Sequence, residues 1–352
     1  MKKTAVAIAV GFLTGIAYAQ THVTINGQLD IGVLKETGSD SRMMRNHDNL
    51  LRYKGTEELG NGTQAVFNLE HRWDSSDGAR CSGNNAIDRL HDTPGVDWQG
   101  AANVGVQNKE WGRVLLGRVS NVSGENYSKV DPFMFDGIAL SAGNMTVLSS
   151  SQTPDSIRYD SPVWHGLRFN GSYSVGRSKH INDYNKSYGN DGFVLGAVYE
   201  DPRFFLLADY ERIQDSDKSW GWNVGAGYTV NDLTLTLGYH THKVSRAVMY
   251  KLLDENNTLK QNSVTAAAKY QSGPHVFKFS YNWAQLDSDG EYDGHSNKYG
   301  LGYDYSLSKR TTLYAIFAYI DNSDGKVGRL YNTNGTESDS MTGINFGITH
   351  RF

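Results

Sequence analysis

Apolar and polar residues alternate along most of this chain. In the stretch 23–31, valine, isoleucine and leucine occupy odd positions, whereas threonine, asparagine, glutamine and aspartate occupy even positions. A period of two predicts a β-strand with one apolar face and one polar face. The pattern recurs to the C-terminus and predicts about sixteen strands. They span residues 23–33, 50–57, 63–73, 102–108, 113–118, 156–161, 167–175, 193–199, 204–212, 220–229, 233–242, 263–270, 275–283, 298–305, 311–319 and 342–352.

The segments between these strands alternate between short and long. Short ones occupy 59–62, 108–111, 201–203, 231–232 and 308–310, and long ones occupy 74–101, 119–155, 178–192, 243–262, 285–297 and 322–341. Short periplasmic turns and long extracellular loops are typical of outer-membrane barrels. A soluble β-sandwich has no reason to alternate its loop lengths in this way. Tyrosine and tryptophan recur near strand ends, as in the aromatic girdles of such barrels, although β-propensity favours the same pattern.

The apolar runs of the chain limit how it could cross a membrane. No segment after residue 19 approaches the roughly 20 apolar residues that a membrane-spanning helix needs. A mature chain that spans a membrane must therefore form a closed barrel, because open sheet edges leave unsatisfied backbone groups in lipid. The fold class expected is all-β. Residues 20–352 form one domain, a transmembrane antiparallel β-barrel of about sixteen strands.

The N-terminus has the three parts of a secretory signal peptide. Two lysines precede an apolar run over residues 5–17, and Ala17-Tyr18-Ala19 places small residues where a signal peptidase reads them. We expect residues 1–19 to be a signal peptide, with cleavage before Gln20. The alternative, a membrane anchor, is disfavoured because the run is too short to span a bilayer.

Composition fits a large barrel but adds no chemistry. Only 38% of the residues are hydrophobic, against roughly 45–50% in soluble globular chains. A wet lumen explains this, because every second wall residue can be polar. The formal charge is −4, and loss of two lysines with the signal peptide makes it −4 − 2 = −6. No basic patch suggests nucleic acid, no motif indicates a cofactor or metal, and Cys81, the only cysteine, cannot form an intramolecular disulfide.

Several segments carry more specific motifs. The most specific is Lys54-Gly55-Thr56-Glu57-Glu58-Leu59-Gly60-Asn61-Gly62. The others occupy 23–32, 111–118, 155–162, 307–314 and 347–352, the last ending in an aromatic residue. The segment 54–62 resembles the second hairpin of the Gram-negative trimeric porins, and 23–32 resembles their first strand. The segments 111–118 and 155–162 resemble the two strands beside loop 3, and 307–314 and 347–352 resemble the penultimate and closing strands. The resemblance is to the neisserial and betaproteobacterial type and covers nearly the whole mature chain.

This resemblance implies a homotrimer of sixteen-stranded barrels in the outer membrane of a Gram-negative bacterium. It implies that loop 3 folds into the pore and narrows it. It also implies that Phe352 belongs to the signal read by the barrel-assembly machinery. The partners of such a protein are outer-membrane lipid and lipopolysaccharide, together with the ions and small hydrophilic solutes that cross.

Alternation also predicts which charged residues face the lumen. Where the neighbours of a base face lipid, the base itself faces inward. The bases selected in this way are Arg52, Lys54, Arg113, Arg158 and Arg168. An arginine on the lipid face near mid-bilayer costs roughly 2–4 kcal/mol, so inward placement is strongly favoured. Arg118 breaks the parity of its strand and reaches the lumen only if Gly117 bends the chain. These six bases are the candidate basic wall of a constriction, the alternative being that they solvate the wall or lie near its mouth.

Loop 3, roughly 119–155, offers acids for the opposing wall. They are Glu125, Asp131 and Asp136. Acids that are simply exposed to water are an equally good interpretation. Charges at the narrowest point decide which ions pass, and bases clustered around loop 3 favour anions. Many relatives carry an arginine where this chain has Leu50 and a small residue where it has Arg52, which moves the basic position along the strand.

The function predicted is a general diffusion porin. Ions and small hydrophilic solutes would cross passively through a water-filled pore with a preference for anions. A substrate-specific outer-membrane channel or a surface receptor is the alternative, which aromatic tracks or dense ligand clusters in the lumen would indicate. An enzyme is disfavoured. His240 and His242 share one face of a strand near the outer rim, but no serine or aspartate can be paired with them from sequence.

Overall fold

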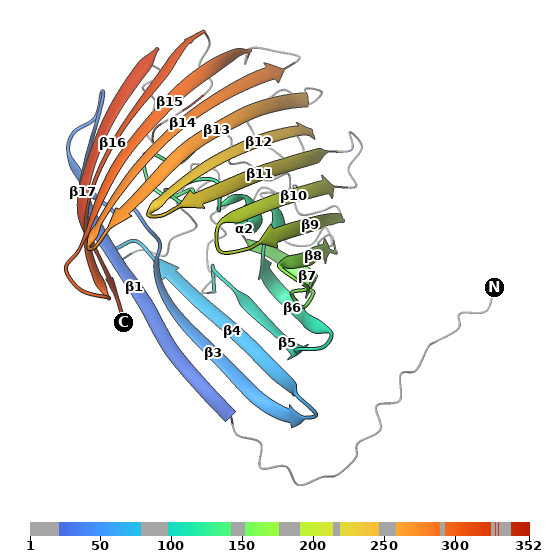
Figure 1. Cartoon of the computed structure of the whole chain (residues 1–352). Coiled ribbons are helices and arrows are strands. Elements are labelled where there is room, and N and C mark those ends of the chain that lie inside the picture. The colour runs from blue at the N-terminus through green and yellow to red at the C-terminus, as the bar shows by residue number, and fades with distance from the viewer. Residues whose placement is uncertain are drawn as a thin grey trace.

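The chain forms one antiparallel sheet that closes on itself around a lumen (Figure 1). The computed structural model describes residues 21–78, 98–141, 152–175, 191–213, 219–245, 258–288, 293–324, 328, 330 and 339–352. The expected signal peptide and Cys81 lie outside these ranges. A short helix, α2 (Val122–Tyr127), lies inside the ring. No helix in the described ranges is long and apolar enough to cross a membrane.

Within these ranges the sheet contains seventeen strands. They are β1 (Thr21–Glu36), β2 (Arg42–Met44), β3 (Asn49–Gly60), β4 (Thr63–Trp73), β5 (Ala102–Asn108), β6 (Gly112–Ser120), β7 (Gln152–Asp160), β8 (Leu167–Ser174), β9 (Gly192–Glu200), β10 (Phe204–Ile213), β11 (Trp220–Val230), β12 (Leu233–Ser245), β13 (Thr258–Ser272), β14 (His275–Ser288), β15 (Gly294–Ser306), β16 (Thr311–Asp324) and β17 (Ser340–Arg351). From β3 onward each strand pairs with the next, and β17 pairs with β1, which closes the ring. The seam pairs Gln28 with Arg351 at one end and Glu36 with Gly343 at the other.

β2 and β3 together occupy one position of the ring. Both pair with β1, which meets β2 through residues 32–34 and β3 through residues 21–28. Seventeen strands thus fill 17 − 1 = 16 positions, which confirms the predicted barrel. Residues 45–48, between β2 and β3, leave the ladder. The sequence did not predict β2, because alternation cannot be recognised over three residues.

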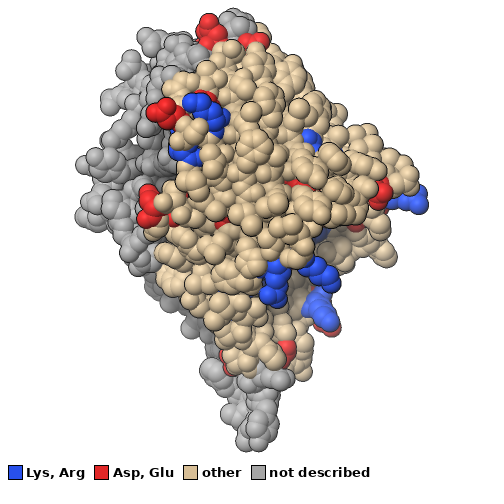
Figure 2. Space-filling view, turned by 90° about the vertical axis from the view of Figure 1, so that its left-hand side faces the viewer, with Lys and Arg blue, Asp and Glu red and all other residues tan. Residues whose placement is uncertain are grey.

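Outward-facing side chains form a broad apolar surface. Leu206, Leu237 and Phe346 are 47%, 59% and 58% exposed, whereas a soluble protein rarely exposes so extensive an apolar patch. Their neighbours in the chain point into the barrel, as the alternation predicted. Figure 2 shows the surface on the side of β16 and β17, where uncharged residues predominate and most charged side chains lie toward the margins. Such a surface is suited to lipid.

Glycines on the inner wall make room for loop 3. A Cβ atom on Gly225 or Gly238 would lie 2.6 or 2.8 Å from a methyl group of Val130, and one on Gly302 would lie 2.7 Å from the ring of Phe133. Real Cβ atoms are not found so close to other atoms. Larger residues at these three positions would therefore displace the loop from the wall.

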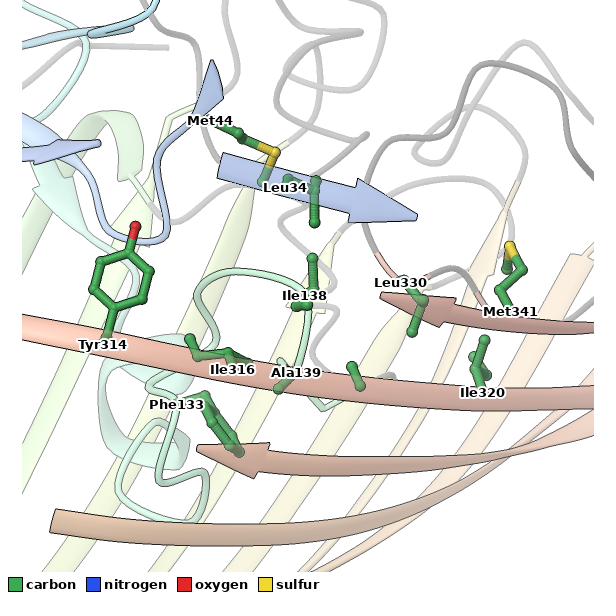
Figure 3. Close-up of a cluster of buried hydrophobic side chains, with 11 residues drawn as sticks. Leu34, Met44, Phe133, Ile138, Ala139, Tyr314, Ile316, Ile320, Leu330 and Met341 are labelled. Carbon is green, nitrogen blue, oxygen red and sulfur yellow. The ribbon is translucent and has the colours of Figure 1, made fainter. Parts of the chain in front are cut away.

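The described part of loop 3 reaches an apolar cluster at the seam of the barrel (Figure 3). Phe133, Ile138 and Ala139 of the loop belong to it. The other members are Leu34 of β1, Met44 of β2, Tyr314, Ile316, Ala318 and Ile320 of β16, Leu330, and Met341 of β17. Complete burial of a large apolar side chain contributes about 1.5–3 kcal/mol. The cluster is therefore a strong anchor for the loop.

Candidate functional site in the barrel lumen

Helix α2 is seated on the inner wall by side-chain hydrogen bonds. Asn126 Nδ2 donates to Asp209 Oδ1 at 2.6 Å and to Asn170 Oδ1 at 3.0 Å. Asn121 Nδ2 donates to Glu211 Oε1 at 2.8 Å, while Asn121 Oδ1 accepts from the backbone at the start of the helix. All five residues are buried. Asn170 lies on β8, and Asp209 and Glu211 lie on β10. These polar contacts therefore fix the start of loop 3 against the inner wall.

The described part of loop 3 covers one side of the lumen. After α2 the chain brings Val130 against β11 and β12, where Thr236 Oγ1 donates to the Val130 carbonyl at 2.6 Å. It then reaches β15 and β16 through Phe133, and β1 and β17 through Ile138. The contacts described for this part of the loop lie on β1, β2, β7–β17 and the segment between β2 and β3, rather than on β3–β6. The inner faces of β3–β6 are therefore the wall that this part of the loop leaves open.

Arg158 is buried where loop 3 departs from the wall. Its guanidinium donates to Glu125 Oε2 and to Asp160 Oδ1, each at 2.7 Å, and to the Ser120 carbonyl at 3.0 Å. The structure thus brings together one candidate base and one candidate acid. The Arg158 side chain is 3% exposed and that of Glu125 is 44% exposed. Because two carboxylates face one guanidinium, this contact holds the loop and leaves little free positive charge.

A ladder of charges crosses the inner faces of β3 and β4. Arg52 donates to Glu70 Oε2 through Nε at 2.6 Å and also through Nη2. Arg72 reaches Glu70 Oε1 at 2.6 Å and Asp48 Oδ2 at 2.8 Å. Arg45 pairs with Asp48 at 2.5 Å. Three arginines share two acids in this ladder, so its net charge is positive.

Three more candidate bases lie toward the short turns, Lys54 and Arg113 on the open wall and Arg168 on the nearby strand β8. Arg113 Nη2 donates to Asp160 Oδ2 at 2.7 Å, yet its side chain remains 41% exposed. Arg113 and Arg168 line a recess of about 830 Å³ beside these turns. Lys54 is exposed, and its charged neighbours are Arg52, Glu70 and Arg113. These bases can act on ions in the pore more directly than the buried Arg158.

Arg118 follows a break in β6. The pairing of β6 with β7 shifts between Gly117 and Val119, and Gly117 has a φ of +117°, which glycine adopts at low cost. The bend on which inward placement of Arg118 depends is therefore present. Arg118 Nε donates to the carbonyls of Gln99 and Gly100 at 3.0 and 2.9 Å, and so ties the end of the long segment between β4 and β5 to the wall.

Asp131 organises loop 3 itself. Its Oδ1 accepts from the backbone N–H of Phe133 and its Oδ2 from that of Ser141, both at 2.9 Å. Burial raises the pKa of Asp131 to about 6, against the opposite effect of these backbone donors. Of the three predicted acids, Asp131 therefore stabilises the conformation of loop 3 through hydrogen bonds within the loop.

Replacing Asp131 by asparagine is expected to remove part of the pH dependence of stability. A raised pKa favours the protonated carboxyl, so its stabilising contribution is fully present below the ordinary value of 3.8 and is lost as the pH rises to about 6. This shift corresponds to about 3 kcal/mol. Thermal-unfolding midpoints in detergent should show less decline from pH 4 to pH 6 in D131N than in the wild type. The exposed-turn variant D232N is the control, and identical profiles for D131N and the wild type would contradict the expectation.

Asp136 faces the segment between β2 and β3. Its Oδ2 lies 3.2 Å from Nδ1 of His47. Burial lowers the pKa of His47, but the carboxylates of Asp136 and Asp30 outweigh it and raise this pKa above its ordinary value. Asp136 therefore links loop 3 to the segment between β2 and β3. Of the three candidate acids, only Glu125 contacts a candidate base among the described residues.

Sequence reasoning overlooked part of the charge ladder. Glu70 and Arg72 lie on the inward side of β4, because Phe67 and Leu69 take the outward positions of its alternation. The rule that selected Arg52 could have selected both. The bases and acids of residues 45–48 could not be found in this way, because these residues lie between strands.

The two histidines lie beneath α2 on the inner face of β12. His240 Nε2 is 2.6 Å from His242 Nδ1, and His240 Nδ1 contacts Asn223 Oδ1. The ring of Tyr127 packs 5.9 Å from that of His240. Both imidazoles are buried. In the part of the chain that is described, no group of three or more histidine, cysteine or acidic residues could hold a metal ion. These contacts are those of residues that support the loop.

The architecture defines the class of protein. A closed barrel with a lipid-suited outer surface, a charged lumen and a loop packed inside it is a channel of the outer membrane. The family model described as Gram-negative porin matches residues 4–325, and the chain belongs to this family.

Known proteins agree with this assignment. An outer membrane porin protein of Bordetella pertussis is 28% identical over 100% of both chains, and outer membrane porin protein 32 of Delftia acidovorans is 26% identical over the same coverage. An anion-selective porin from Comamonas acidovorans has a TM-score of 0.77 at 21% identity, over 95% of this chain and 100% of that one. A trimer form of OmpT from Vibrio cholerae has a TM-score of 0.67 at 13% identity, over 94% and 99%. The predicted family, outer-membrane location and porin function are confirmed.

Proposed function

We propose that this porin prefers anions and that its selectivity comes from the wall left open by loop 3. The observation that carries the proposal is the excess of bases on this wall (β3–β6), on the adjoining strands β7 and β8, and on residues 45–48. The bases are Arg45, Arg52, Lys54, Arg72, Arg113, Arg118, Arg158 and Arg168. The acids that face them are Asp48, Glu58, Glu70, Asp160 and Glu125. Eight bases against five acids leave a net charge of 8 − 5 = +3.

Burial of acids elsewhere in the lumen strengthens this excess. Asp30, Glu36, Asp209 and Glu211 face inward on β1 and β10, and none is more than 2% exposed. Loop 3 contacts Asp209 and Glu211, Asn46 between β2 and β3 contacts Asp30, and Arg42 of β2 pairs with Glu36. Because the exposed charges are mainly basic, anions entering the pore meet an attractive wall.

The zero-current potential in a salt gradient tests this proposal. Purified protein in a planar bilayer should give a potential of the sign that anion preference produces. The potential should shrink at about 1 M salt, where the Debye length is about 3 Å. A potential of the opposite sign would overturn the anion preference and leave the porin assignment intact.

The same bilayer separates a general pore from a substrate-specific channel. A general diffusion porin passes a current proportional to salt concentration, and its lumen has no site that one solute saturates. The mixed charges on the open wall support the general diffusion porin. Block of the current by one solute at low concentration would instead support a specific channel. We expect no enzymatic activity.

We further propose a homotrimer whose C-terminus guides assembly. The trimer form of the Vibrio cholerae relative supports the oligomeric state. Phe352 is tied to Gly27 through hydrogen bonds of 3.0 and 3.1 Å, and its ring occupies the space that a side chain on Gly27 would fill. The terminal aromatic residue therefore lies at the seam, where barrel-assembly machinery would meet a chain that is about to close.

A further inference from the structure

Two imidazoles beneath helix α2 are joined to it by a chain of hydrogen bonds. Asn223 of β11 donates from Nδ2 to Ser123 Oγ of the helix, and its Oδ1 contacts His240 Nδ1 of β12. His240 Nε2 lies 2.6 Å from His242 Nδ1. Each of these four residues is at most 3% exposed. The seat of the helix on the wall therefore includes two groups that can take up a proton.

The chain uses both N–H groups that the neutral rings carry. A neutral imidazole has one N–H donor and one acceptor nitrogen. Because Asn223 presents its amide oxygen, His240 Nδ1 donates to it and His240 Nε2 accepts from His242 Nδ1. His242 Nε2 is left without a hydrogen, and within the described residues it is buried without a hydrogen-bond partner. A further proton must therefore bind at this nitrogen or break the chain.

The groups that face the two rings from the elements packed against them are neutral. They are Gly221 and Asn223 of β11, Gln261 and Ser263 of β13, and Ser123 and Tyr127 of α2. Asp209 and Glu211 lie in the same rows but on the far side of β11, where they bind asparagines at the start of loop 3. Glu125 of α2 pairs with Arg158. Within the described ranges, His242 forms no ion pair.

A proton on His242 would place a positive charge where neither water nor a carboxylate contacts it. A buried charge without a partner is strongly unfavourable. In water, an imidazole takes up a proton below about pH 6.5. Departure of the helix exposes both rings to water, so acid favours the departed state. Two titrating imidazoles shift this equilibrium by up to about a hundredfold for each pH unit below that value.

We propose that the His240–His242 pair makes the docking of loop 3 sensitive to acid. Protonation of the pair releases helix α2 from the inner wall, and the start of the loop moves into the pore and interrupts the current. The inference rests on the observed packing of the loop and is independent of the anion preference of the pore. It adds a regulatory property to a channel whose loop is otherwise a fixed part of the lumen.

The far end of the loop stays bound in acid. Phe133 and Ile138 are held in the apolar cluster at the seam, which carries no charge to titrate. The raised pKa of His47 keeps that imidazole cationic beside Asp136 as the pH falls. Acid therefore frees only the helix end of the loop. The released segment remains tethered inside the lumen, where it can obstruct the pore.

Single-channel recording of H240N/H242N in planar bilayers tests this proposal. Asparagine carries an amide N–H close to where Nδ1 stands in histidine, but it does not titrate between pH 7 and pH 5. Closing transitions of the wild type should become at least about tenfold more frequent from pH 7 to pH 5. Those of the double variant should change less than about threefold. H22N/H165N, which removes two exposed histidines, is the matched control and should respond as the wild type does.

Hydrogen exchange of the α2 backbone reports the release of the helix itself. After correction for the intrinsic effect of pH, exchange over residues 122–127 should accelerate in acid in the wild type and in the control, but not in H240N/H242N. A wild type whose transitions and exchange do not respond to acid would overturn the proposal. An equal response in the double variant would also overturn it and would assign the effect to Asp209 and Glu211.

A single substitution serves if the double variant does not fold. H242N removes the ring that must take the added proton and leaves the contact between His240 and Asn223 in place. The acid-induced increase in closing transitions should then be at least about threefold smaller than in the wild type. An undiminished increase in H242N would contradict the role of the pair.

Discussion

Replacing Lys54, Arg113 and Arg168 together by glutamine is expected to lower the anion-to-cation permeability ratio several-fold. Lys54 and Arg113 lie on the open wall of the lumen and Arg168 lies beside it on β8, and the Arg113 side chain is 41% exposed. A unit charge about 5 Å from an ion in water contributes about 0.8 kcal/mol, which is roughly a fourfold change in local ion concentration. Loss of Arg113 does not strand Asp160, because Asp160 keeps its contact with Arg158.

The zero-current potential of this variant in a salt gradient gives the ratio directly. At about 0.1 M salt, where the Debye length is about 10 Å, the potential should move toward that of a cation-preferring pore. The matched control is R203Q/K309Q/R310Q, which removes equal charge from exposed short turns and should leave the potential unchanged. If both variants shift the potential equally, the open wall does not set selectivity.

Replacing Arg158 by glutamine is expected to loosen loop 3 more than it changes selectivity. The substitution removes the contacts with Glu125, Asp160 and the Ser120 carbonyl. Loss of one partner of a buried ion pair costs about 3–5 kcal/mol. The lower end applies here, because Asp160 keeps Arg113 and Glu125 is 44% exposed. We therefore expect a lower thermal-unfolding midpoint and noisier single-channel currents, with only a small shift of the zero-current potential.

R158K separates the positive charge from the geometry of the guanidinium. Lysine keeps the charge but cannot make the paired hydrogen bonds of arginine, so current noise should fall between the wild type and R158Q. A quiet R158Q channel with a strongly shifted potential would contradict the anchoring role. Arg158 would then be a selectivity residue of the open pore.

The strands could be predicted from sequence because each carries its own signal. In β12, for example, Leu235, Leu237 and Tyr239 alternate with inward-facing residues, and all three are exposed on the outer surface. A period of two needs no partner strand to be recognised. The same rule placed Arg52 and Arg158 on the inner side, where they pair with Glu70 and Asp160.

The arrangement of loop 3 could not be predicted in this way. Asn126 contacts Asp209 and Asn121 contacts Glu211, pairs separated by 83 and 90 residues along the chain. No periodic pattern connects such residues, since their meeting depends on the closed barrel. Asp131 illustrates the difficulty, because its carboxylate accepts hydrogen bonds from the backbone of its own loop. In the sequence, an aspartate with this role looks the same as one exposed to water or one that lines a constriction.

The apolar cluster at the seam makes loop 3 dependent on the ends of the chain. Phe133 and Ile138 of the loop belong to this cluster. Its other members include Leu34 of the first strand, β1, Ile316 of the penultimate strand, β16, and Met341 of the last strand, β17. Until these strands come together, the apolar end of the loop has no place to bind. Docking of the loop is therefore thermodynamically coupled to the final step of assembly. Barrels that have not closed would carry an undocked loop, and they would differ from mature ones in their pores as well as in their stability.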